Sequence, residues 1–303
     1  MLITKNDMEK KTISLLEEGL IDLDYPLYNI LISEKAPQWW TILKNDKEIY
    51  IDIRKGNVID AYYRGGRIAG IAYSGRSKNI TVKAHPKYLG HTDSTDIKYY
   101  KKRVRDGKVT FDPIYHDCSD WIINRMNELK NNIQEHYSGD FEGEDTSEKY
   151  IQWNLVIKGR DKYLDSEFSH RFYDEKRESI RIDLLKIQNG HFVFEELKRI
   201  KDNRLRTNKG IPEIITQMQN YRAFIRENYE RMTKYYRELY KIKVKLGLPV
   251  PPVTDINSIC MNPEPCLLIA NFYNKESPAR KERITKIQEV LATINVIPEI
   301  ITE

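Results

Sequence analysis

The sequence predicts a mixed α/β (α+β) protein with two domains, a β-rich domain over residues 1–115 and a second domain over residues 116–303 with a mixed central sheet flanked by helices. Three observations lead to this prediction. A length of 303 residues is typical of about two domains. Hydrophobic residues make up 40% of the chain, which is enough to build a core in each domain. Short β-rich runs fill most of the first 115 residues, whereas helical spacing of apolar residues begins at Ser119.

The first domain is expected to begin with a helix over residues 7–18 and to continue as a sheet. Runs of β-branched and aromatic residues predict strands over residues 39–43, 49–53, 58–63, 67–73 and 79–82. Turn residues separate these runs, and the even spacing predicts an antiparallel meander of four or five strands. Gly65-Gly66 fits a hairpin turn, because the longer glycine pattern of a phosphate-binding loop is absent.

A basic segment follows this predicted sheet. Five cations and two aromatic residues lie within eight positions, namely Lys98, Tyr99, Tyr100, Lys101, Lys102, Arg103 and Arg105. Lysine and arginine neutralise phosphates, and tyrosine rings stack on bases. The segment is therefore a candidate nucleic-acid-binding surface, and an ordinary solvated strand is the alternative.

The second domain is expected to begin with a helix capped by Ser119. Asp145 and Glu148 form a capping-box pattern for a second helix that ends near Gly159. Three strands are expected over residues 164–173, 180–188 and 191–200, and a further strand over 266–272. Pro212 is expected to open one helix of about 50 Å that continues to Gly247. Ser277, followed by Pro278, is expected to cap the last helix.

Composition argues against several classes of protein. Charged residues make up 31% of the chain, the mean hydropathy is -0.64, and no apolar stretch approaches the ~20 residues that span a bilayer. No secretion signal is visible at the start of the sequence, so a cytoplasmic location is expected. The cysteines, Cys118, Cys260 and Cys266, are too few for a disulfide framework and have no zinc-site spacing.

The most informative segment is a predicted hairpin around Asn189-Gly190. This dipeptide is typical of a type I′ turn, which requires positive φ at both central residues. With these two residues as the loop, Gln188 pairs with His191 and the register places Asp183 directly opposite Glu196. Opposed side chains have Cβ atoms about 5 Å apart, so two carboxylates repel there unless a cation or a proton is shared.

Lys198 shares the face of Glu196, because side chains alternate along a strand. The apolar residues Leu185 and Phe194 lie on the same face, so the charged group ends an apolar layer and is partly desolvated. Two carboxylates and an ammonium group suit metal-assisted attack of water on a phosphodiester. A surface hairpin in which Lys198 only forms a salt bridge is the alternative.

Asp183, followed twelve residues later by Glu196-Leu197-Lys198, resembles the motif of the PD-(D/E)XK nuclease superfamily, which has a restriction-endonuclease-like core. The resemblance covers residues 118–290. It implies that Asp183, Glu196 and the backbone carbonyl of Leu197 bind a metal ion, and that Lys198 acts on the attacking water. Ile182 stands where the motif has proline, which removes one cue.

Two further features add to the resemblance. Gln217 and Tyr221 form a Q-x-x-x-Y pattern on the following helix, which is similar to that of RecB-like members and implies contact with the lysine region or a phosphate. In the other reading, Tyr221 simply belongs to the apolar seam of the helix. The family often has a metal-binding glutamate before the core. Glu148 is the best-placed candidate, although its capping role also explains it, and Glu167 is its rival.

The resemblance implies a Mg²⁺-dependent phosphodiesterase, with Mn²⁺ as a substitute cofactor, that acts as a DNA endonuclease. RNA is the alternative substrate. No membrane partner is expected, and a homodimer is left open. The second functional class is a non-catalytic nucleic-acid or protein interaction module that retains the nuclease fold.

Overall fold

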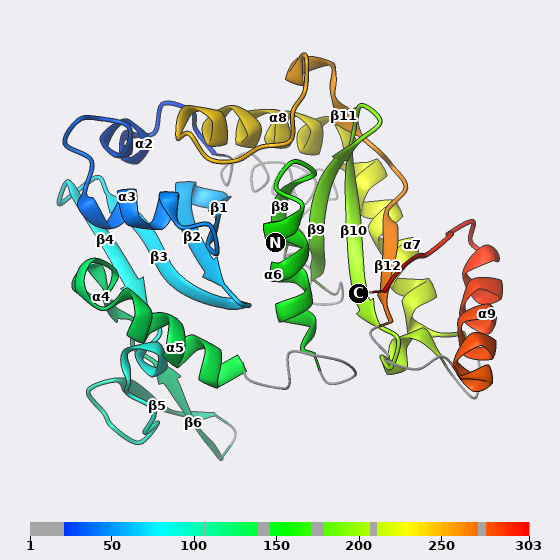
Figure 1. The fold of residues 1–303 in the computed structure, drawn as a ribbon, viewed down its shortest axis with the longest axis horizontal. Helices are drawn as coiled ribbons and strands as arrows, with labels where there is room; N and C mark the ends of the chain where they lie inside the picture. The colour runs from blue at the N-terminus through cyan, green and yellow to red at the C-terminus, as the bar shows by residue number, and fades with distance from the viewer. Residues whose placement is uncertain are drawn as a thin grey trace, which may run out of the picture.

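The computed structural model describes residues 21–105, 107–137, 146–170, 179–206, 211–271 and 277–302. The expected helix over residues 7–18 lies outside the described residues, as does Asp145. The chain forms a mixed α and β structure with one sheet in each half (Figure 1).

The first sheet is the expected antiparallel meander. Its strands are β1 (Tyr50–Arg54), β2 (Val58–Tyr63), β3 (Gly66–Ser74), β4 (Asn79–Ala84) and β7 (His116–Asp117). They lie in the order β1-β2-β3-β4-β7, and every pairing is antiparallel. The turn between β2 and β3 has positive φ at Arg64 (46°) and Gly65 (90°), as a type I′ hairpin requires.

The expected strand over residues 39–43 is wrong. Residues Gln38–Asn45 form helix α3, which follows the short helix α2 (Pro26–Leu31). Trp39, Trp40 and Leu43 are buried, and their spacing places them on one side of a helix facing the core. Aromatic and β-branched residues favoured a strand in the sequence, but burial of this stripe decides for a helix.

The expected helix capped by Ser119 is two helices, α4 (Ser119–Asn124) and α5 (Met126–Tyr137), interrupted at Arg125. Cys118, not Ser119, holds the N-cap position of α4. Both helices lie beside the first sheet (Figure 1), and Asn132 on α5 donates a hydrogen bond to the carbonyl of Tyr88 at 2.9 Å. These helices were expected in the second domain, which begins at residue 116, but they pack with the first half.

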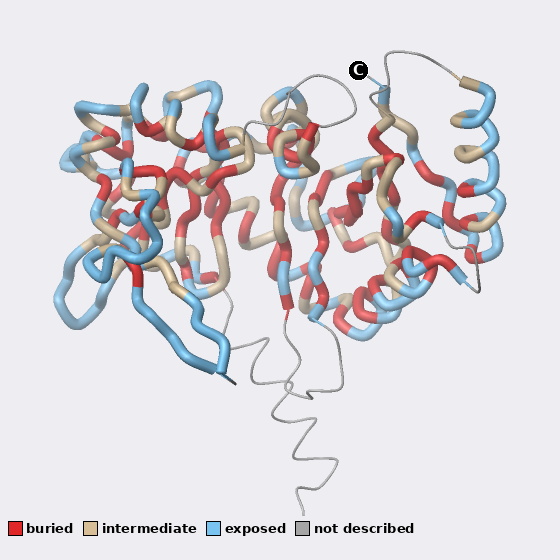
Figure 2. Tube along the Cα trace, turned by 90° about the horizontal axis from the view of Figure 1, so that it is seen from below, coloured by how far each residue is buried: buried red, intermediate tan, exposed pale blue. Residues whose placement is uncertain are grey.

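The basic segment forms a separate two-stranded ribbon. Strand β5 (Tyr100–Arg105) pairs antiparallel with β6 (Lys108–Pro113), and neither belongs to the two larger sheets. The short 3₁₀ helix η2 (Pro86–Leu89) precedes the ribbon. Figure 2 shows most of the ribbon as an exposed trace that stands away from the buried interior.

The second sheet is mixed. It contains β8 (Tyr163–His170), β9 (Ile180–Gln188), β10 (His191–Arg199), β11 (Cys260–Met261), β12 (Cys266–Ala270) and β13 (Glu299–Ile301). The order is β13-β12-β10-β9-β8, and β11 also pairs with β10. Strands β8, β9 and β10 are antiparallel neighbours, whereas β12 runs parallel to β10 and to β13. The sequence did not predict the short strands β11 and β13.

Helices α6 (Glu148–Lys158), α7 (Glu213–Glu227), α8 (Tyr229–Lys245) and α9 (Pro278–Ala292) accompany this sheet. Ser147, not Asp145, caps α6 by accepting a hydrogen bond from the N–H of Tyr150. Ser277 caps α9 as expected. The expected 50 Å helix is two helices, because the chain turns at Asn228, whose side-chain amide bonds to the carbonyl of Phe224 and competes with helix continuation. Pro212 is the N-cap residue of α7.

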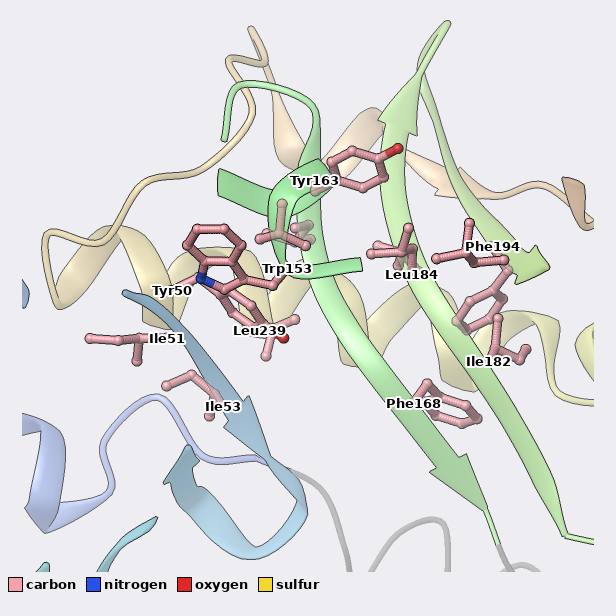
Figure 3. Packing of buried hydrophobic residues seen from close by; sticks show 14 of the residues in the cluster. Tyr50, Ile51, Ile53, Trp153, Tyr163, Phe168, Ile182, Leu184, Phe194 and Leu239 are labelled. Atoms are coloured by element: carbon pink, nitrogen blue, oxygen red, sulfur yellow. The ribbon is translucent and has the colours of Figure 1, made fainter. Parts of the chain in front are cut away.

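One hydrophobic cluster extends through both halves. Figure 3 shows Ile51 and Ile53 of β1 on one side of Trp153, with Leu184 and Phe194 of the second sheet beyond it. The indole N–H of Trp153 donates to the carbonyl of Glu48 at 2.9 Å, which fastens α6 to the first half. The three cysteines are free thiols. Among the described helices, none is long and apolar enough to cross a bilayer.

Candidate active site

The hairpin around Asn189-Gly190 has the predicted register. Both turn residues have positive φ, 51° and 75°, and Gln188 pairs with His191. The paired residues continue to Leu184 and Glu195, so the next step places Asp183 opposite Glu196. The N–H of Leu197 donates to Oδ2 of Asp183 at 2.9 Å, which holds the aspartate side chain against β10. The local turn therefore brings the two carboxylates together.

Lys198 lies on the same face and forms an ion pair with Glu196. Its ammonium group also donates to the carbonyl of Leu197 at 2.9 Å. Glu196 and Lys198 are 3% and 1% exposed. The expected salt bridge exists, but it is buried in the structure and not solvated on a surface hairpin.

The two residues of the Q-x-x-x-Y pattern contact Glu196 directly. Nε2 of Gln217 donates to Oε1 of Glu196 at 2.7 Å, and the Tyr221 hydroxyl lies 3.1 Å from Oε2. The same hydroxyl also donates to the carbonyl of Arg181. Tyr221 is buried in the core as well, so both readings of this residue describe part of its environment. Two side chains of helix α7 thus contact the Glu196 carboxylate, which β10 carries.

The electrostatics show the cost of placing two carboxylates in a buried site. Burial, reinforced by the Asp183 carboxylate, raises the pKa of Glu196 to about 7, although Lys198 and Tyr221 lower it. Burial also raises the pKa of Asp183, against the opposing effects of Lys198 and the Leu197 N–H. Burial and mutual repulsion therefore disfavour negative charge on both groups at once, and an additional cation would offset this repulsion.

These groups line an open cleft of about 1030 Å³. Glu148, on the first turn of α6, lines the same cleft, and burial raises its pKa. Lys198 lowers that pKa and Asp183 raises it, so Glu148 interacts electrostatically with the site. Within the part of the chain that the structure describes, however, no three or more His, Cys, Asp or Glu side chains form a metal-binding group. Glu148 thus lines the same cleft as the predicted metal ligands Asp183 and Glu196, but it does not form a metal-binding cluster with them among the described residues.

The donor atoms nevertheless suit a hard divalent cation. Asp183 and Glu196 supply carboxylate oxygens and Leu197 a backbone carbonyl, which are the ligand types that Mg²⁺ and Mn²⁺ prefer. Oε1 of Gln217 is buried in the cleft wall and has no hydrogen-bond partner among the described residues. A buried acceptor of this kind has a free position for water or a ligand donor.

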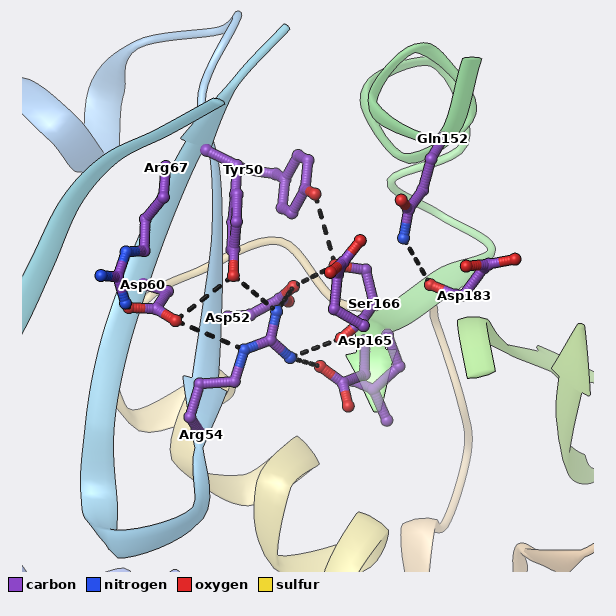
Figure 4. Close-up of polar contacts among 12 residues, drawn as sticks. Tyr50, Asp52, Arg54, Asp60, Arg67, Gln152, Asp165, Ser166 and Asp183 are labelled. Carbon is purple, nitrogen blue, oxygen red and sulfur yellow. Dashed lines mark hydrogen bonds and ion pairs between the residues drawn. The ribbon is translucent and has the colours of Figure 1, made fainter. Parts of the chain in front are cut away.

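Sequence reasoning missed Gln152. Its side-chain amide donates to the carbonyl of Asp183 at 2.6 Å, and it is only 2% exposed (Figure 4). Gln152 lies four residues after Glu148, so both occupy one face of α6. The sequence signal that could have identified Gln152 is its spacing, because a residue four positions after Glu148 lies on the same helix face as that candidate metal ligand.

A second charged cluster between the two halves was also missed. Arg54 on β1 bonds to Asp52 at 3.1 Å and to Asp165 on β8 at 3.0 Å, and it lies 3.7 Å from Asp60 (Figure 4). Lys243 on α8 bonds to Asp52 at 2.8 Å. Asp52 is paired directly opposite Asp60, so the rule that identified Asp183 and Glu196 applies to this hairpin too.

The predicted nucleic-acid-binding segment divides into two groups. The cations Lys98, Lys101, Lys102, Arg103 and Arg105 are exposed. Tyr100 is buried, and its hydroxyl donates to the carbonyl of His91 at 2.8 Å. The ring of Tyr99 stacks on the His91 ring with centroids 3.6 Å apart. The expectation that Tyr100 stacks on a base is therefore wrong, because its ring is buried. Tyr99 is half-buried with its ring stacked on His91, and its contact with a base stays a prediction.

Comparisons with models of protein families, with curated proteins and with solved structures find no match to this chain.

Proposed function

We propose that this protein is a Mg²⁺-dependent nuclease that hydrolyses phosphodiester bonds in DNA, with a PD-(D/E)XK active site. One observation supports the proposal above all others. Asp183, Glu196 and Lys198 converge on the face of strands β9 and β10 that lines a large cleft, and Gln217 and Tyr221 of the next helix contact Glu196.

The order of elements supports the same assignment. Helix α6 precedes the antiparallel strands β8, β9 and β10, and α7, α8 and the parallel strand β12 follow. A restriction-endonuclease-like core is expected to have this helix, three-strand, helix, strand order around a mixed sheet. The three motif residues occupy adjacent antiparallel strands, as that core requires.

Asp183, Glu196 and the Leu197 carbonyl would hold the cation. When bound, it supplies a Lewis acid beside the phosphate and makes water a stronger nucleophile. The Leu197 N–H orients Asp183, while Gln217 and Tyr221 orient Glu196. Lys198 holds an ammonium group beside the reacting phosphate, where it offsets negative charge in the transition state and orients the attacking water. The buried setting strengthens each of these interactions.

The test is a cleavage assay on supercoiled plasmid, linear duplex, single-stranded DNA and RNA, with Mg²⁺, Mn²⁺ or EDTA. We expect cleavage that requires the divalent cation and is lost in Asp183→Asn. The matched control is Glu195→Gln, which changes the neighbouring carboxylate on the opposite face of β10. Absence of cleavage of every substrate would reject the nuclease and leave the non-catalytic interaction module.

A further inference from the structure

The ribbon β5–β6 presents cations in an ordered way. Directly opposed residues share a face, so Lys101, Arg103 and Arg105 of β5 lie on one face together with Lys108 of β6. Lys102 lies on the other face. Asp112 is the acidic residue on the charged face and forms an ion pair with Arg103. The ribbon is therefore a narrow, strongly basic arm.

The cleft itself lacks such an excess of positive charge. Among the described lining residues, Glu148, Glu167, Asp183, Glu196, Glu213 and Glu227 are acidic, and Lys149, Arg181, Lys198 and Arg204 are basic. The acidic groups outnumber the basic ones, so these side chains do not by themselves attract a polyanion. A nucleic-acid substrate of this site needs an anchor elsewhere, and the ribbon supplies the missing positive charge. In Figure 1 the ribbon and the end of α6 that carries Glu148 face the same lower side of the molecule.

The shape of the anchor indicates which nucleic acid it fits. Binding of single strands relies on exposed aromatic rings, but Tyr100 is buried and the half-buried Tyr99 ring stacks on His91. The major groove of B-form DNA is about 12 Å wide and admits a two-stranded β-ribbon. The corresponding groove of duplex RNA is deep and too narrow for side chains to read.

We propose that the β5–β6 ribbon enters the major groove of duplex DNA and anchors the duplex across the cleft. This inference rests on the proposed nuclease function and assigns its substrate class. The cations contact phosphates along the groove walls. Val104 and Val109 are paired across the ribbon on the opposite face, together with Lys102, so they point away from a duplex bound on the charged face.

The first test measures binding to a 30-base-pair duplex in EDTA, where no metal-dependent cleavage interferes, over a series of salt concentrations. The variant Lys101→Ala, Arg105→Ala, Lys108→Ala should reduce the log-log salt slope by about 2 to 3 units, at ~0.9 for each phosphate contact. The matched control removes three exposed cations distant from the ribbon, by Lys35→Ala, Arg76→Ala and Lys78→Ala, and should keep the wild-type slope.

Two further variants separate charge from folding and from apolar contact. Exchange of lysine and arginine at the three ribbon positions keeps the charge and should keep the slope. Val104→Thr with Val109→Thr changes only the opposite face of the ribbon and should keep both the affinity and the slope. An unchanged slope in the alanine variant, with its melting temperature intact, would overturn the proposal.

Binding assays with modified and alternative nucleic acids test whether the ribbon occupies the major groove. Bulky substituents on pyrimidine C5 fill the major groove and should weaken binding, whereas a minor-groove ligand should not compete. Binding of single-stranded DNA or duplex RNA as tight as that of duplex DNA would also overturn the assignment. If the ribbon binds duplex DNA but the protein cleaves no substrate, the proposed nuclease activity is rejected and the duplex-binding role stands. If metal-dependent cleavage occurs but the ribbon variants bind DNA like the wild type, only the duplex-binding role is rejected.

Discussion

At the scale of single residues, the hairpin offers a matched pair of buried lysines. Lys198 pairs with Glu196 on the cleft face, and Lys186 pairs with Glu195 on the opposite face. Both lysines are 1% exposed. Loss of one partner of a buried ion pair costs about 3 to 5 kcal/mol. The two lysines therefore have similar structural environments but different proposed roles.

We expect Lys198→Met and Lys186→Met to lower the melting temperature by comparable amounts, and Lys198→Met alone to abolish cleavage. Thermal unfolding and plasmid nicking in Mg²⁺ measure the two effects separately. Nicking by folded Lys198→Met at the wild-type rate would remove this lysine from the proposed mechanism.

The second residue-scale prediction concerns Glu196 in the absence of metal. Its pKa rises from the ordinary value of 4.5 to about 7 on folding, so the folded state binds the proton more tightly than the unfolded state does. Stability is therefore favoured at low pH and decreases as the pH rises from 4.5 to 7, by up to about 3 kcal/mol.

Glu196→Gln should remove most of this decrease and raise the melting temperature in EDTA at neutral pH, while it abolishes cleavage. Asp183→Asn should act in the same direction, because it removes the opposed charge. Urea unfolding between pH 4.5 and 8 tests both variants. A lower neutral-pH stability for both variants in EDTA would contradict repulsion between the Asp183 and Glu196 carboxylates.

At the scale of elements, α7 contributes to the pKa of Glu196 through the Tyr221 hydroxyl, which opposes the larger effect of burial. This hydroxyl lies 3.1 Å from Oε2 of Glu196, and its hydrogen bond lowers the glutamate pKa. Tyr221→Phe keeps the ring in the core and deletes only the hydroxyl. We expect the acid limb of the pH profile for cleavage to move to higher pH. Tyr235→Phe, on α8, is the control, and an equal shift in that variant would show a general effect.

The break at Asn228 is the other element-scale feature that matters for the site. One continuous helix would carry the α8 residues away from the first half of the molecule. The turn lets α7 contact Glu196 through Gln217, and lets α8 reach Asp52 through Lys243. Two helices in place of one thus connect the candidate site with the interface between the halves.

At the scale of the whole molecule, Arg54 joins the two halves through Asp52 and Asp165. Arg54→Met leaves buried carboxylates without their partner and should cost about 3 to 5 kcal/mol. Arg103→Met removes an exposed pair with Asp112 and should cost less than about 1 kcal/mol. Urea unfolding followed by tryptophan fluorescence measures both. Equal costs would show that the Arg54 cluster does not stabilise the contact between the halves.

Local chain geometry was sufficient to predict the centre of the candidate site. The Asn189-Gly190 turn specifies the register, and register alone places Asp183 opposite Glu196 with Lys198 on the same face. The resemblance to a known motif predicted contact of Gln217 and Tyr221 with the lysine region or a phosphate, and the structure places both side chains on Glu196, the ion-pair partner of Lys198. The cap at Ser277 was likewise predictable, because capping depends on neighbouring residues.

Contacts between distant segments decided the rest. Residues 39–43 have strand-forming side chains, but the helix buries Trp39, Trp40 and Leu43 together in the core. The bond between Arg54 and Asp165 joins residues 111 positions apart, and that between Gln152 and the Asp183 carbonyl spans 31. Such pairings depend on how the two sheets pack, and spacing within one segment carries no information about them. Tyr100 shows the same limit. The composition of the basic segment around it suggested that its ring stacks on a base, but tertiary packing buries that ring.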